Sequence, residues 1–142
     1  MGRFIGSLLF LSVNLCVVGQ TLLVPGDIAI VAYNARLHSR NCNISFVLLR
    51  DIVAGTTINF TDNGWTSPGV LRSTEGTDVW TASTALSAGT VILYPFTNVR
   101  LSTKGDQVLL FQGTVDDPNF IFAINNNNTG RQQGWNSMNT SS

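Results

Sequence analysis

Residues 56–65 are TTINFTDNGW, and the alternation within this stretch indicates how the chain folds. Ile58 and Phe60 fall on one side of an extended chain, and hydroxyl and amide side chains fall on the other. The pattern therefore predicts a strand from Thr57 to Thr61 with one buried face. Asn-Gly is the dipeptide best suited to the positive φ angles of a type I′ turn, so Asn63-Gly64 predicts a tight hairpin after this strand.

Two interpretations of this turn are open. In the structural one, Asp62 hydrogen-bonds the turn backbone, and Trp65 starts the next strand by packing on Phe60. In the functional one, Asp62 and Asn63 ligate calcium through their oxygens, and Trp65 is a contact surface for a sugar. The geometry that Asn-Gly supplies to a turn favours the structural interpretation.

Six more segments have strand patterns, and turn residues such as Gly, Pro and Asn separate them. They are residues 27–33, 44–50, 78–82, 90–96, 106–112 and 119–124. The first two are apolar on both sides, as expected of a strand in a sandwich core. Seven short strands at this spacing predict an all-β fold, an immunoglobulin-like antiparallel β-sandwich. The predicted core is Ile28, Ile30, Phe46, Leu48, Ile58, Phe60, Trp80, Ile92, Val108, Leu110, Phe120 and Phe122.

The first nineteen residues have the features of a secretory signal peptide. Arg3 precedes an apolar run from Phe4 to Val18, and Val17 and Gly19 suit a cleavage that leaves Gln20 first. A membrane span would need roughly twenty apolar residues, which is longer than this run. A lipid-anchored Cys16 is disfavoured because bulky Leu15 precedes it. We therefore expect a secreted, extracellular chain.

The charge of the chain argues against several classes of partner. Eight basic and eight acidic residues make up 11% of the sequence, and loss of Arg3 with the signal leaves a net charge of −1. Such a chain lacks the basic stripe expected for nucleic acid and the polybasic patch expected for an anionic membrane. The expected partners are therefore an extracellular protein or a glycan.

Export also affects the cysteines and the asparagines. Cys42 remains alone once the signal is removed, which predicts a buried thiol, an intermolecular disulfide, or a partner cysteine elsewhere. Asn-x-Ser/Thr signals for N-glycosylation occur at Asn43, Asn59, Asn127 and Asn139, and Asn43 and Asn127 are the favoured sites.

The sequence resembles lamin-tail-like domains, which are immunoglobulin-like β-sandwich modules of secreted and surface proteins. The resemblance covers residues 26–124 and is carried by GDIAIVAYN, FVLLRDIVAGTTINFTDNGW, EGTDVWTA, LSAGTVI, LSTKGDQVLLFQGT and PNFIFAI. It implies a sandwich domain in residues 20–124 and no shared set of catalytic residues. Such domains usually continue past the point where this sequence ends, so residues 125–142 are expected to be a polar tail of a longer domain or protein.

Metal and catalytic signals are weak. Asp116 and Asp117, like Asp62, offer the oxygens that calcium binds, but their spacing matches no EF-hand. His38 lies four residues before Cys42, in a segment with two arginines that suits an exposed loop better than a nucleophile–base pair. We expect no enzyme activity and no cofactor, with calcium as the alternative.

Among the tryptophans, Trp65 and Trp135 are the candidate ligand contacts, since Trp80 lies within a strand. The sequence thus predicts a non-enzymatic extracellular interaction or matrix module. The alternatives are a carbohydrate- or calcium-dependent binding module of a larger secreted protein, and an accessory part of a secreted hydrolase.

Overall fold

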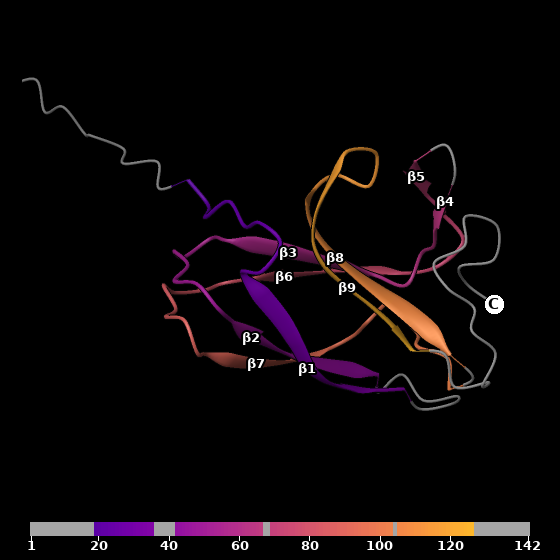
Figure 1. Cartoon of the computed structure of the whole chain (residues 1–142), viewed down its shortest axis with the longest axis horizontal. Coiled ribbons are helices and arrows are strands. Elements are labelled where there is room, and N and C mark those ends of the chain that lie inside the picture. Colours follow the sequence, from indigo (N-terminus) through magenta and orange to yellow (C-terminus); the bar gives the residue numbers. More distant parts are fainter. Residues whose placement is uncertain (1–18, 36–41, 67–68, 104, 127–142) are drawn as a thin grey trace, which may run out of the picture.

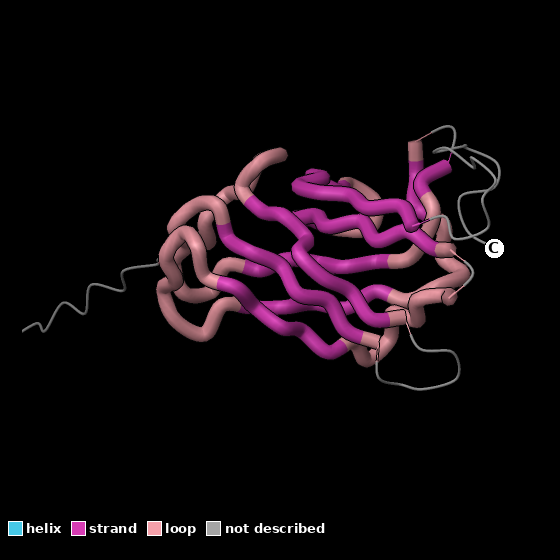
Figure 2. Tube along the Cα trace, turned by 60° about the horizontal axis from the view of Figure 1, so that its bottom comes forward, coloured by secondary structure: helices cyan, strands magenta, loops and turns pink. Residues whose placement is uncertain are grey.

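The computed structural model describes residues 19–35, 42–66, 69–103 and 105–126, and these residues contain strands and loops but no helix (Figure 2). Over the described ranges, therefore, no helix is long and apolar enough to cross a membrane. The strands are β1 (Ile28–Asn34), β2 (Asn43–Leu48), β3 (Thr57–Thr61), β4 (Trp65–Thr66), β5 (Val70–Leu71), β6 (Thr77–Thr81), β7 (Val91–Pro95), β8 (Asp106–Gly113) and β9 (Pro118–Asn126).

Seven of these strands form two antiparallel sheets, with the orders β1-β2-β7 and β6-β3-β8-β9. In Figure 1, β2 and β7 lie below β3 and β6, so the sheets form two layers. The predicted all-β antiparallel sandwich is confirmed, and all seven predicted strands are present. The fourth predicted strand, β6, pairs with β3 and so lies in the sheet of β3, β8 and β9. In the constant-type immunoglobulin fold, the fourth strand lies in the same sheet as the first two strands.

The two additional strands, β4 and β5, form a separate short hairpin. Figure 1 shows this hairpin at the upper right, beside the sandwich. The strand β9 is also longer than predicted, since it begins at Pro118 and continues to Asn126.

The core lies between the two sheets and is built mainly from the predicted residues. Phe60 is fully buried there, and its ring contacts those of Phe46, Tyr94 and Phe96 at centroid distances of 5.4–5.8 Å. Trp80 is partly buried and meets Phe46 edge-on. Large buried side chains that the sequence analysis omitted include Leu23, Ile44, Phe111 and Ile121.

The prediction that Phe120 joins Phe122 in the core is wrong. A bulge in the β8–β9 ladder pairs Leu110 with Phe122 but Phe111 with Phe120, so Ile121 is an extra residue. An extra residue reverses the side on which the following side chains lie. Phe122 packs against the core, whereas the ring of Phe120 contacts Phe111 and Trp65.

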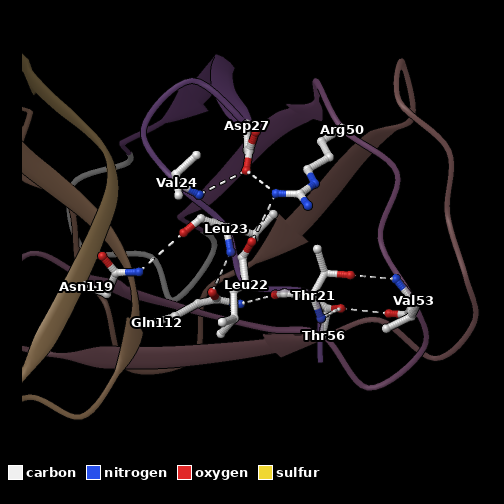
Figure 3. Close-up of polar contacts among 10 residues, drawn as sticks. All are labelled: Thr21, Leu22, Leu23, Val24, Asp27, Arg50, Val53, Thr56, Gln112 and Asn119. Atoms are coloured by element: carbon white, nitrogen blue, oxygen red, sulfur yellow. Dashed lines mark hydrogen bonds and ion pairs between the residues drawn. The ribbon is translucent and has the colours of Figure 1, made fainter. Parts of the chain in front are cut away.

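A segment before β1, residues 20–27, crosses one end of the sandwich and is called the strap here. Figure 3 shows its contacts: the buried side chain of Gln112 accepts a hydrogen bond from the Leu23 N–H and donates to the Thr21 carbonyl. Asn119 donates to the Leu23 carbonyl, and the Leu23 side chain is fully buried. The strap therefore belongs to the folded domain.

Candidate functional site

The segment 61–64 does not form the predicted hairpin turn. Strand β3 pairs with β6 and β8, whereas β4 pairs with β5, so β3 and β4 are not partners. Gly64 is also absent from the glycines with positive φ, which a type I′ turn would require. The prediction was wrong because the Asp62 and Asn63 side chains bind distant backbone groups.

The side chains of Asn63 and Asp62 form hydrogen bonds with the backbone of the segment before β6. The Asn63 amide accepts from the Glu75 N–H and donates to the carbonyls of Glu75 and Gly76, at 2.9–3.3 Å. Asp62 Oδ1 accepts from the Gly76 N–H at 2.8 Å, and Asp62 Oδ2 accepts from the Arg100 N–H at 2.9 Å. Both carboxylate oxygens of Asp62 therefore accept hydrogen bonds from backbone N–H groups, and Asp62 is only 3% exposed.

Trp65 is partly buried and packs edge-on against Phe120, with ring centroids 4.9 Å apart. The predicted contact with Phe60 is therefore wrong, because Phe60 lies between the sheets and Trp65 lies on the outer side of β8 and β9. Part of the indole is committed to this packing, which leaves less of the ring for a ligand. Trp135 lies outside the described residues.

Two more carboxylates hold the loop that joins β7 to β8. Asp78 Oδ2 accepts three consecutive backbone N–H groups, those of Thr97, Asn98 and Val99, at 2.9–3.0 Å. Asp106 Oδ2 accepts from the Ser102 N–H at 2.7 Å. Asp62, Asp78 and Asp106 together are called the carboxylate clasp. The clasp carboxylates, one from β6, one from β8 and one from the residue after β3, accept five N–H groups of this loop.

The electrostatics of the clasp are set by burial. Burial raises the pKa of the Asp62 carboxyl, although the Arg100 and Gly76 N–H groups lower it, and the Asp78 charge raises it further. Burial likewise raises the pKa of Asp106 to about 6. Hydrogen bonds from the Ser102 and Gln107 N–H groups lower this pKa, and the Asp62 charge raises it. Asp106 also lines a small apolar cavity of about 10 Å³, together with Tyr33, Leu101, Ser102, Val108 and Ile124.

A polar hollow of about 460 Å³ opens beside the clasp and is lined by Asp62, Thr74, Glu75, Gly76, Asn98 and Arg100. Gly76 is required here because a Cβ at this position would overlap the backbone carbonyl of Asn98. The hollow is open, and its buried carboxylate already accepts two N–H groups. These contacts give the segment a structural role.

The calcium candidates are not brought together. Asp62 follows the end of β3, whereas Asp116 and Asp117 lie in the β8–β9 turn, beyond the opposite end of the β8 ladder with β3. Within the described ranges, no group of three or more His, Cys, Asp or Glu side chains is placed to hold a metal ion. His38 lies outside those ranges.

Two of the predicted glycosylation sites are described, and they occupy different positions. Asn59 lies within β3, between Val79 of β6 and Phe111 of β8, and its Nδ2 donates to the Gly113 carbonyl at 3.2 Å. Asn43 is the first residue of β2 and is partly exposed. Asn127 and Asn139 lie outside the described residues.

Cys42 is a free cysteine that is only 3% exposed, and its thiol contacts the Leu101 carbonyl at 4.0 Å. This position matches the buried thiol among the predicted alternatives. An intermolecular disulfide through Cys42 would need this buried thiol to become exposed.

The outer side of the β1-β2-β7 sheet carries several exposed apolar side chains beside Asn34, Asn43 and Ser45. Ile44, Phe46 and Leu48 of β2 point into the core, so the residues between them point outward, as do their partners across the ladders. Val31, Val91 and Leu93 are 55%, 60% and 65% exposed. We call the set the outer apolar face; it comprises Ala29, Ala32, Val47, Val91, Leu93 and Pro95 of the ladders, together with the exposed Val31 at the bulge of β1.

No residue of the outer apolar face was predicted as a site residue. The signal was present, since 27–33 and 44–50 are apolar on both sides, but it was interpreted as burial on both sides. A two-layer sandwich covers only one side of each sheet, so the second apolar side is left in solvent.

Comparison of the chain with protein-family models, with curated proteins and with solved structures found no match. The resemblance to lamin-tail-like domains therefore stays a prediction.

Proposed function

We propose that this chain is a secreted, non-enzymatic interaction module of the extracellular space or matrix, and that it binds another protein through the outer apolar face. The observation that carries the proposal is the exposure of Val91 and Leu93 on a sheet whose other side forms the core. Apolar patches on a folded surface mark contact sites more often than scattered single residues do.

The chemistry of the face favours a protein over a sugar. Its seven residues carry no charge and no aromatic ring, and the ladder pairs Ser45 with Leu93 and Val47 with Val91. A sugar site would need rings and several hydrogen-bonding groups, whereas an apolar protein surface gains free energy when such side chains leave water.

A photoreactive leucine analogue at Leu93 tests the proposal in the secreted full-length chain. We expect it to form covalent adducts with a partner protein, while the same analogue at Val115, 49% exposed in the β8–β9 turn, forms few. Unlabelled chain should compete for the adduct, and unlabelled Leu93→Lys chain should compete about tenfold less well, a loss of about 1.4 kcal/mol.

Leu93→Lys should lower the free energy of unfolding by less than about 0.5 kcal/mol, because the side chain lies mostly in water. Equal adduct yields at Leu93 and Val115 after N-linked glycans have been removed, or equal competition by both chains, would disprove the proposed use of the face. Export is checked separately, by N-terminal sequencing of the secreted material, which should begin at Gln20.

A further inference from the structure

Asn43 and the outer apolar face share one side of one sheet. Asn43 belongs to the outward set of β2, and the ladder places it opposite Pro95 of β7 and Asn34 of β1. Leu93 is the diagonal neighbour of Asn43, because it pairs with Ser45, two residues further along β2. Diagonal neighbours in an antiparallel pair are about 7–8 Å apart, so a group on Asn43 reaches Leu93.

The Asn43-Ile44-Ser45 signal therefore lies beside Leu93, the most exposed large hydrophobic side chain of its sheet. Its third residue, Ser45, is the direct cross-strand partner of Leu93. Asn59 offers a contrast within the same molecule. Its amide nitrogen is already hydrogen-bonded to Gly113, and Thr61, the third residue of its signal, is fully buried.

We infer that Asn43 carries an N-linked glycan that covers the Leu93 and Pro95 end of the outer apolar face and thereby limits the access of a partner protein. The inference rests on the proposed export and on the proposed use of the face. A bulky, hydrophilic glycan suits this position because it replaces water over side chains that would otherwise attract other apolar surfaces.

The transfer uses a lipid-pyrophosphate-linked oligosaccharide as its donor. The Nδ2 of Asn43 forms a bond to the anomeric carbon, the bond from that carbon to the pyrophosphate oxygen breaks, and the lipid pyrophosphate leaves. The amide nitrogen gives up one proton, and no electrons are exchanged.

The test uses the full-length chain secreted from eukaryotic cells. Glycopeptide mass analysis should find the glycan on Asn43, and both Asn43→Gln and Ser45→Ala should remove it. In each variant the photoreactive analogue at Leu93 should give about tenfold more adduct, which corresponds to about 1.4 kcal/mol of recovered binding. Asn59→Gln is the matched control and should leave the yield unchanged.

Enzymatic removal of the glycan from folded wild-type protein covers the case in which a variant folds poorly, and it should raise the yield to the same extent. Binding of a fluorescent apolar dye should also rise on removal of the glycan, whether or not a partner protein is present. Secreted protein with a bare Asn43, or with unchanged dye binding after glycan removal, would overturn the inference.

The two proposals can fail separately. If Leu93 gives no adduct in any form while dye binding rises on glycan removal, the glycan covers the face and the proposed protein partner is wrong. If the chain stays in cells with residues 1–19 attached, export is wrong and the inference fails with it.

Discussion

The two ends of the sandwich are held by different chemistry. At the strap end, Gln112 and Asn119 hold residues 20–24 through neutral amide groups. At the other end, the carboxylate clasp holds the β7–β8 loop through Asp62, Asp78 and Asp106. Neutral amides hold their partners at any ordinary pH, whereas buried carboxylates must be taken out of water as charges. The strap end also has a carboxylate, Asp27, which accepts from the Val24 N–H and pairs with Arg50. The pH dependence that follows from the raised pKa values of Asp62 and Asp106 should arise at the clasp end.

Asp78→Ala should have the largest effect, because it removes one oxygen that accepts three backbone N–H groups at a position only 4% exposed. Unsatisfied buried donors cost about 1–3 kcal/mol each, so we expect the free energy of unfolding to fall by about 3–5 kcal/mol. Urea unfolding measures this loss.

Asp51→Ala is the matched control, since its exposed carboxylate accepts a single N–H, that of Ala88. It should cost less than about 1 kcal/mol. Similar losses for the two variants would show that the clasp does not hold the loop as described.

Gln112→Ala tests the strap end and should have an intermediate effect. The variant loses the bonds to the Leu23 N–H and to the Thr21 and Thr57 carbonyls, which should cost about 2–3 kcal/mol. Hydrogen exchange at the Leu23 amide should accelerate with it. Gln20→Ala, whose exposed side chain contacts only Thr57, should leave the Leu23 amide protected; loss of protection there would contradict the assigned role of Gln112.

The smallest effect concerns pH. The pKa of Asp106 is about 6 in the folded chain against an ordinary value of 3.8, so the folded state binds more protons than the unfolded state between these values. The stability that this carboxyl contributes is complete below pH 3.8 and is lost as the pH rises through about 6. Asp62, whose pKa is also raised, contributes in the same direction.

The measurement is urea unfolding from pH 4 to pH 7, and the quantity of interest is the difference between wild type and Asp106→Asn. Wild type should lose stability relative to the variant over this window, because only the wild type must give up the proton. Gln112→Ala should keep the wild-type pH dependence. If wild type instead gained stability relative to Asp106→Asn over this window, the pKa of the Asp106 carboxyl would not be raised in the folded chain.

Most of the fold could be predicted from local patterns. The alternation of 57–61 and the turn residues between the segments located seven strands, because side-chain period and turn chemistry are local properties. The positions that were predicted wrongly depend on contacts between residues far apart in the sequence. The φ angle of Gly64 was misjudged since Asp62 and Asn63 bond to Gly76, Arg100 and Glu75, and Phe120 was misplaced since the bulge at Ile121 lies in a ladder.

The candidate site was harder to predict than the fold. The residue pattern of a strand can show that both of its sides are apolar, but it does not show which side another sheet will cover. The predicted ligand contacts were Trp65, which packs on Phe120, and Trp135, which lies outside the described residues. The segments that form β1 and β2 were predicted to lie in the middle of the core. The outer apolar face became visible only once the sheets were assembled.

The order of side chains along the chain by itself determined the strands, the positions of the turns, the glycosylation signals and the near-neutral charge, because each is a property of neighbouring residues. Only the tertiary structure decided that Asn43 shares a surface with Leu93, and that Asp62 bonds to Gly76 and Arg100. These relations join residues 14–50 positions apart, and which of them meet depends on how the two sheets pair and pack.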